Sequence, residues 1–171
     1  PKPSSAASDV YKRQINILDF QTMKFSHLKH ISDDEQSLPN NSIYRLYKDQ
    51  MDNIWIGSIH GGLFAIKKVF IKTYKDVPLN NPNGVSERTV VSIFEDKDTL
   101  LWIGTDGGGI NSFDQKTNTF HHYPTTYGEK VTSITDFSEN ELLLSCFNKG
   151  VFTFNKRTAQ LSLIHISEPT R

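Results

Sequence analysis

The sequence is poor in the features that mark several common classes of protein. A single cysteine, Cys146, excludes an internal disulfide and a cysteine-rich metal site, and we expect it to be a small buried side chain in a strand. The 19 Lys and Arg residues equal the 19 Asp and Glu residues, so the formal net charge is +0. Because nucleic-acid binding needs a basic surface, we expect no nucleic-acid contact by this segment. No apolar run approaches the roughly 20 residues that span a membrane, and the start shows no secretion signal.

What the sequence does contain is an internal repeat. Trp55-Ile56-Gly57 recurs 47 residues later as Trp102-Ile103-Gly104, without a gap between the aligned positions. A third copy follows at an offset of 41 residues, with Leu143 in place of tryptophan and Ser145 in place of glycine. The tail of an earlier copy opens the chain at Ile15-Asn16. A period in the range of roughly 20 to 50 residues is typical of architectures in which each unit stacks on its neighbours.

Each repeat predicts four short strands joined by tight turns. In the middle unit these are residues 89–94, 100–105, 109–113 and 119–123, which are rich in β-branched and aromatic residues. Val90 and Ile93 point to opposite faces of their strand, yet both positions are apolar in every copy. Strands of this kind are covered on both sides, as in a propeller blade; a solenoid fits an all-strand unit with three hairpin turns less well.

We therefore predict an all-β fold, a β-propeller fragment of about three four-stranded antiparallel blades plus part of another. The predicted propeller covers residues 15–162, with a blade remnant at 15–30 and blades at about 41–75, 88–124 and 129–162. Residues 1–14 and 163–171 break the pattern and resemble translated adapter sequence, so we expect them to be non-native. Three blades and a remnant do not close a propeller, and we expect the isolated segment to self-associate through its uncovered sheets.

The expected topology places the varied loops at one end. With the strands of a blade named a to d from the axis outwards, the b–c turns and the d-to-a links share an end, which we call the b–c end. His60, Asp106 and Asn148 fall in three successive b–c turns, and Arg88 precedes a strand a at the same end. Polar loops on a rigid scaffold are common binding sites, so we predict ligand contact by these four residues. Unconstrained loops and a surface arginine are the alternatives.

Other residues that suggest chemistry have simpler interpretations. Trp55 and Trp102 occupy the same position in successive units, which favours packing over sugar stacking. Asp49 and Asp96 are predicted to hydrogen-bond turn backbones. His121 and His122 are adjacent in a strand and point to opposite faces, so they cannot easily share a metal ion. We predict no catalytic residues, no metal site and no cofactor.

The repeat resembles the two-component regulator propeller family. Leu101-Trp102-Ile103-Gly104-Thr105 with Gly108-Gly109-Ile110 fits its pattern closely, and Ile54-Trp55-Ile56-Gly57-Ser58 with Gly61-Gly62-Leu63 fits nearly as well. The resemblance implies a periplasmic segment of a bacterial hybrid two-component sensor that responds to oligosaccharides. Histidine kinase activity would then reside elsewhere in a full-length relative.

We thus expect a non-catalytic sensor segment whose partners are an oligosaccharide ligand and the missing blades of the same propeller. Whether the full-length protein forms a homodimer is left open. Two alternatives remain: a propeller enzyme acting on glycans, and a protein-interaction scaffold. No paired carboxylates or recurring metal set supports the former, and the Gly-His and Trp-Asp signatures of scaffold repeats are missing.

Overall fold

The chain folds almost entirely into antiparallel β-sheets. The computed structural model describes residues 5–9, 14–34, 37, 38, 40–67, 70–79 and 81–164. Within these ranges, the sheets are one of three strands and three of four strands, accompanied by one short 3-10 helix, η1 (Pro124–Thr126). Among the same residues, no helix has the length and apolar character needed to cross a membrane.

The strands follow the repeat. The first sheet contains β1 (Ser5–Asp9), β2 (Gln14–Asp19) and β3 (Lys24–Leu28). Blade 1 contains β4 (Ile43–Lys48), β5 (Ile54–Ser58), β6 (Leu63–Lys67) and β7 (Phe70–Tyr74). Blade 2 contains β8 (Val90–Glu95), β9 (Leu101–Thr105), β10 (Ile110–Asp114) and β11 (Thr119–His122). Blade 3 contains β12 (Val131–Ser138), β13 (Glu141–Cys146), β14 (Gly150–Asn155) and β15 (Leu161–Leu163).

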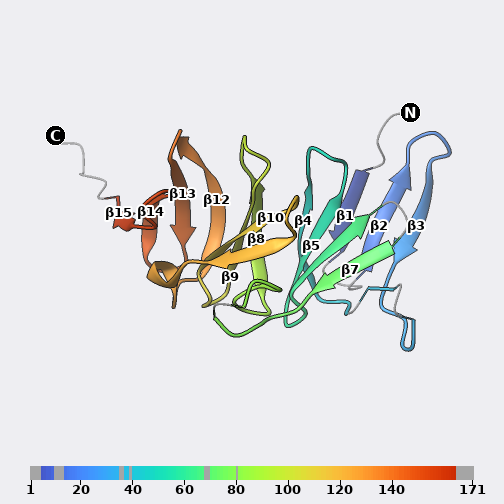
Figure 1. Ribbon diagram of the computed structural model, residues 1–171. Helices are drawn as coiled ribbons and strands as arrows, with labels where there is room; N and C mark the ends of the chain where they lie inside the picture. Colours follow the sequence, from blue (N-terminus) through green and yellow to red (C-terminus); the bar gives the residue numbers. More distant parts are fainter. Residues whose placement is uncertain are drawn as a thin grey trace.

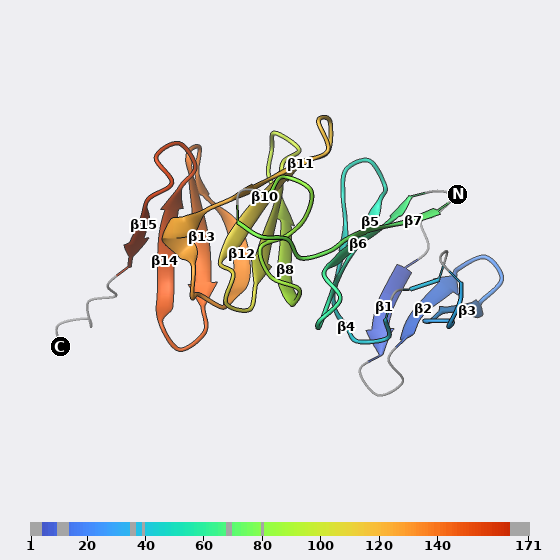
Figure 2. The same cartoon turned by 60° about the horizontal axis from the view of Figure 1, so that its bottom comes forward.

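The four sheets stand side by side in chain order. Figures 1 and 2 show the first sheet at one end of the row and blade 3 at the other, with blades 1 and 2 between them. In each blade the four strands pair in sequence order, and the strands a of the blades (β4, β8 and β12) lie next to one another. The predicted fold class, an all-β propeller fragment of about three blades plus part of another, is confirmed.

Three apolar cores hold the row together, and each lies between two sheets. Trp55 of blade 1 packs against Ile93 and Phe113 of blade 2, and Trp102 of blade 2 packs against Leu142 and Phe154 of blade 3. A third core joins the first sheet to blade 1 through Ile15, Ile43 and Ile56. Burial of apolar area on both faces of a sheet is the main stabilising term in such a stack. The packing interpretation of the two tryptophans is confirmed.

The glycine two residues after each tryptophan allows the next blade to pack closely. A Cβ atom on Gly104 would lie 2.2 Å from Ser92 Oγ and 2.5 Å from the carbonyl oxygen of Val131 in blade 3. At Gly57 the added atom would meet Val90 Cγ1 of blade 2 at 2.7 Å. All three distances are shorter than real Cβ contacts. Glycine is therefore required at these positions while the neighbouring blade packs this closely.

The long link between blades 1 and 2 protects an exposed strand edge. Pro82 accepts a hydrogen bond from the Phe120 amide at 2.8 Å, and the Gly84 carbonyl accepts one from His122 Nε2 at 2.9 Å. The link therefore runs beside β11, the outermost strand of blade 2. Covering an edge in this way removes a site of unwanted strand pairing.

The two ends of the chain contribute short strands. Ser5–Asp9 forms β1 and pairs along β2, an element that the repeat pattern does not predict. Leu163, the first residue of the predicted foreign C-terminal segment, pairs with Phe152 in blade 3. Residues 1–4, 10–13 and 165–171 lie outside the described residues. That the two terminal segments are non-native stays a prediction.

Candidate functional site

The b–c turns of the three blades share one backbone arrangement. The amides of Ile59, Asp106 and Phe147 donate to the carbonyls of Ser42, Thr89 and Lys130 at 2.8, 3.0 and 2.9 Å, respectively. Each bond ties the first residue of a b–c turn to the residues that lead into strand a of the same blade. The backbone is thus fixed in all three blades, whereas the side chains at these positions differ completely. A rigid frame that carries varied side chains is the usual arrangement of a binding surface.

The next position of each turn has a left-handed backbone. His60, Gly107 and Asn148 are equivalent, and their φ angles are 60°, 101° and 58°. Glycine, asparagine and, less often, histidine are the residues that tolerate this region. The choice of His60 and Asn148 is therefore partly explained by the turn itself. Asp106 lies one position earlier in its turn and is equivalent to Ile59 and Phe147.

Three of the four predicted site residues meet at one place. The Gly62 amide, in the turn of His60, donates to the Arg88 carbonyl at 2.6 Å. Thr89 then joins both turns, because its hydroxyl accepts from the His60 amide at 3.4 Å and its carbonyl accepts from the Asp106 amide. The structure thus brings His60, Arg88 and Asp106 to one junction of blades 1 and 2.

The side chains at this end are open to solvent. His60 and Asn148 are exposed, and the Arg88 side chain is 58% exposed with only a long 3.9 Å contact to Glu87. Asn148 lies one blade beyond the other three residues. It adjoins them through Lys130, whose carbonyl accepts from Phe147, the neighbour of Asn148.

Lys130 is a site residue that the sequence reasoning missed. Its ammonium group forms an ion pair of 2.7 Å with Asp106, and this contact joins blade 2 to the start of blade 3. The hydrogen bond to Asp106 raises the pKa of Lys130, which keeps the ammonium group charged at neutral pH. Alignment of Lys130 with Ser42 and Thr89 was the available signal, since all three occupy the variable position before strand a.

The glycines at residues 107–109 do not form a phosphate cradle. The amides of Gly107 and Gly109 both donate to the Glu129 carbonyl, at 3.1 and 3.3 Å. These donors are therefore committed to the link between blades 2 and 3. The Gly109 backbone also has a φ angle of 70°, which explains the glycine by conformation alone.

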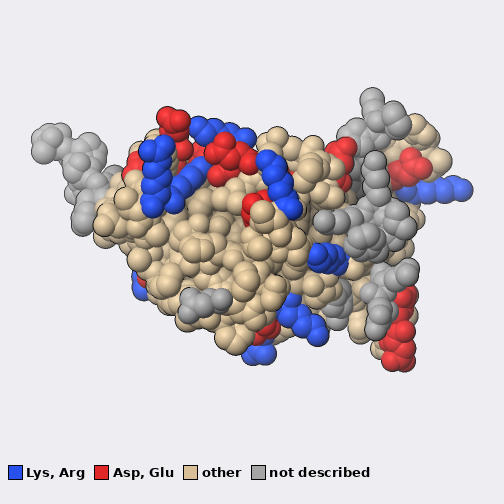
Figure 3. Space-filling view, viewed as in Figure 1, with Lys and Arg blue, Asp and Glu red and all other residues tan. Residues whose placement is uncertain are grey.

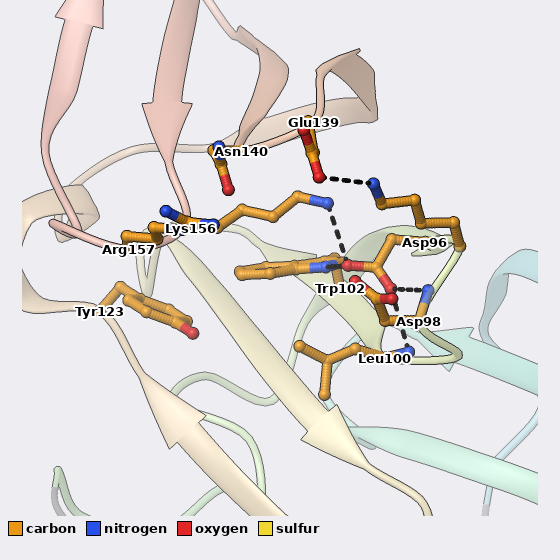
Figure 4. A pocket seen from close by; sticks show the side chains of 10 residues that line it. Asp96, Asp98, Leu100, Trp102, Tyr123, Glu139, Asn140, Lys156 and Arg157 are labelled. Atoms are coloured by element: carbon orange, nitrogen blue, oxygen red, sulfur yellow. Dashed lines mark hydrogen bonds and ion pairs between the residues drawn. The ribbon is translucent and has the colours of Figure 1, made fainter.

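The opposite end, where the a–b and c–d turns lie, has a pocket of about 380 Å³ between blades 2 and 3. Lys156 of blade 3 reaches across it to Asp96 of blade 2 at 3.1 Å, above the buried ring of Trp102 (Figure 4). Asn140, Glu139 and Arg157 complete its rim. Charged side chains gather on this end of the molecule, along the upper edge of Figure 3. Sequence reasoning did not anticipate the pocket because it forms between two repeats.

Asp49 and Asp96 act as predicted, with one addition. Each carboxylate accepts hydrogen bonds from the amides of its own turn, such as those of Asn53 and Leu100. Each also accepts the indole N–H of its tryptophan, Trp55 or Trp102, at 2.8 Å. The aspartates therefore fix the turn and satisfy the buried indole together, which is a structural role.

The other residues of chemical interest are also placed. His122 is buried and His121 is exposed, so their opposite orientation is confirmed. Cys146 is buried in β13, and burial raises the pKa of its thiol to about 11. Among the described residues, no group of three or more His, Cys, Asp or Glu side chains is arranged to hold a metal ion.

Residues 37–60 and 84–107 match the protein family described as two component regulator propeller. Each segment runs from the approach to strand a to the b–c turn, in blades 1 and 2. These two segments are thus similar to the repeat of that family. The similarity was expected from the recurring Trp-Ile-Gly sequence and is confirmed. No curated protein sequence matches the chain significantly.

Solved structures show the same fold. The extracellular domain of a putative hybrid two-component system from B. thetaiotaomicron matches with a TM-score of 0.74 and 19% identity, over 95% of this chain and 24% of that one. Virginiamycin B lyase from Staphylococcus aureus matches with a TM-score of 0.71 and 17% identity, over 98% and 54%. PorZ, a surface component of the type-IX secretion system of Porphyromonas gingivalis, matches with 0.63 and 12%, over 92% and 26%.

These likenesses concern the fold. The chain spans about a quarter of the length of the first structure and about half of the lyase. One of these relatives is the extracellular part of a two-component system, and another is an enzyme.

Proposed function

We propose that this chain is a non-catalytic, ligand-sensing segment of a periplasmic two-component sensor and that its ligand is an oligosaccharide. The observation that carries the proposal is the b–c end, where three blades hold unlike side chains on one repeated backbone frame. The match to the regulator propeller family and the likeness to an extracellular sensor domain support it. His60, Arg88, Asp106 and Asn148 are the proposed contacts, with further blades of the same propeller as structural partners.

The chemistry of this end suits a polyhydroxyl ligand. His60 and Asn148 each offer a donor and an acceptor, Arg88 offers donors and Asp106 offers acceptors. Sugars need many hydrogen bonds of both kinds in a small area. Because the turns already fix the backbone, binding has to order only the side chains.

Isothermal titration of this chain with a panel of oligosaccharides tests the proposal. We expect heat of binding for at least one glycan, weakened in the Arg88→Ala and His60→Ala variants, and no product by chromatography. Absence of binding to every glycan would contradict it.

An enzyme is the second candidate, because a lyase shares this fold over 98% of the chain. Formation of shortened or unsaturated products from any glycan in the same samples would favour that reading. An unchanged glycan after prolonged incubation with binding heat would favour the sensor.

A further inference from the structure

Lys130 lies where the b–c ends of blades 2 and 3 meet. Its ammonium group pairs with Asp106 of blade 2 at 2.7 Å and lies 5.5 Å from the ring centre of Phe147 in blade 3. Residues from two successive blades thus surround one cation, a juxtaposition that only the stacking of the blades creates.

The aromatic side chain of this cluster is open to solvent. Phe147 is 58% exposed, although it is large and apolar. The equivalent residues of blades 1 and 2 are Ile59 and Asp106, so the turn does not require an aromatic residue at this position. An exposed aromatic ring beside polar groups offers an apolar face and hydrogen-bonding partners to the same ligand.

The two lysines at this end are paired with carboxylates. Lys130 is paired with Asp106 and Lys149 with Glu129, both at 2.7 Å. An anionic ligand would have to compete with a carboxylate for either lysine. A neutral ligand can instead donate to Asp106 and accept from Lys130 without disturbing the pair, since the carboxylate and the ammonium group each have unused hydrogen-bonding capacity.

We propose that Asp106, Lys130 and Phe147 form a subsite for one neutral sugar unit. This inference rests on the proposed function and specifies it. The face of the aromatic ring carries negative potential and attracts the electron-poor C–H groups of a sugar ring. The sugar ring lies against Phe147, and its hydroxyl groups bond to the Lys130–Asp106 pair. Neutral oligosaccharides therefore bind in preference to sulfated or uronic-acid glycans.

The experiment compares two phenylalanines of equal exposure at opposite ends of blade 3. Phe147 is 58% exposed at the b–c end and Phe137 is 57% exposed at the a–b end. Titration with neutral oligosaccharides (xylo-, malto- and cello-oligosaccharides) and acidic ones (oligogalacturonides and chondroitin oligosaccharides) is carried out on the native chain. The same titrations follow for Phe147→Ala and Phe137→Ala, each checked for folding by circular dichroism.

We expect binding of a neutral glycan that weakens about tenfold in Phe147→Ala and less than about twofold in Phe137→Ala. If a glycan binds the native chain and the Phe147→Ala variant equally well, the subsite is overturned while the proposed function stands. A preference for acidic glycans would overturn the neutral-sugar assignment in the same way. If no glycan binds the native chain, the proposed function itself fails, and the subsite with it.

Discussion

Blades 2 and 3 have the same four-stranded arrangement, but their second strands, β9 and β13, differ in burial. All five residues of β9 are buried, because Trp102 faces blade 3 whereas Leu101 and Ile103 face blade 1. In β13 buried and half-exposed residues alternate, and no sheet among the described residues covers its far side. The two blades therefore show the same strand with and without a neighbour.

The residues that differ are those that would touch the next blade. Asp96, Trp102 and Gly104 contact Lys156, Phe154 and Val131 of blade 3. The equivalent residues in blade 3 are Phe137, Leu143 and Ser145. All three residue types are absent together from blade 3. This indicates that the tryptophan, the aspartate that accepts its N–H and the glycine that allows close packing act together in blade stacking. A further blade could not pack against blade 3 as closely as blade 3 packs against blade 2, because Ser145 carries a side chain where blade 2 has Gly104.

The strongest test of this comparison removes the tryptophan. Trp102 is 1% exposed, stacks on Tyr123 at 5.5 Å and donates to Asp96. We expect Trp102→Ala to lower the free energy of unfolding by about 3–5 kcal/mol, measured by urea denaturation. Leu143→Ala at the equivalent position of blade 3 should cost only about 1 kcal/mol, since that side chain is half-exposed. Equal losses would show that the neighbouring blade does not matter.

The next largest effect on the free energy of unfolding is expected from substitutions at Gly104 and Ser145. Gly104→Ser places a Cβ atom against Ser92 Oγ and the Val131 carbonyl and disturbs the 2.7 Å hydrogen bond between them. We expect a loss of about 1–3 kcal/mol from overpacking. The reverse change in blade 3, Ser145→Gly, should cost about 0.5–1 kcal/mol through strand entropy alone. If both changes cost the same in urea denaturation, the close approach is not limiting.

Two adjacent carboxylates at the end of β8, Glu95 facing blade 1 and Asp96 facing blade 3, give opposite pH effects. Burial raises the pKa of Glu95, with a hydrogen bond from Gln50 opposing it, and Glu95 Oε1 is buried without a partner. Burial also acts on Asp96, but the hydrogen bonds from Trp102 and Lys156 outweigh it and lower the pKa. In the folded protein Glu95 therefore holds its proton more strongly than in the unfolded chain, whereas Asp96 loses its proton more readily.

The sign of each effect follows from these shifts. Stability is lost at Glu95 as pH rises from its ordinary pKa of 4.5 through the raised folded value, and lost at Asp96 as pH falls below 3.8. We expect Glu95→Gln to raise the free energy of unfolding by about 1 kcal/mol at neutral pH and by nothing at about pH 4. Asp96→Asn should instead lower it at neutral pH. A gain from Glu95→Gln that persists at low pH would contradict the assignment.

The smallest effect concerns the thiol of blade 3. Cys146 replaces Thr105 of blade 2, whose hydroxyl donates to the Gly109 carbonyl at 2.8 Å. Because its pKa is raised to about 11, Cys146 should react slowly with a disulfide reagent in the native chain and rapidly in urea. Cys146→Thr should change stability by less than about 1 kcal/mol. Fast labelling of the native chain would show that β13 opens.

Prediction from sequence succeeded where the repeat itself carries the information. The strands, the buried tryptophans and the turn-forming aspartates follow from residue type and spacing within one unit. The link beside β11, the pocket above Trp102 and the Lys130 cluster could not be predicted in that way. Each joins residues from different blades, and the side chains concerned, such as Lys156 and Phe147, look like ordinary surface residues in their own unit.

The sequence by itself determined that this chain forms stacked four-stranded blades, because each repeat contains three hairpin turns and its apolar residues lie on both faces of a strand, which requires a neighbouring sheet on each side. Tertiary structure alone decided which polar side chains meet. The three blades are brought into register by close contacts such as that of Gly104 with Val131. Only this register places Asp106, Lys130 and Phe147 within reach of one ligand, since their distances depend on how one sheet leans on the next.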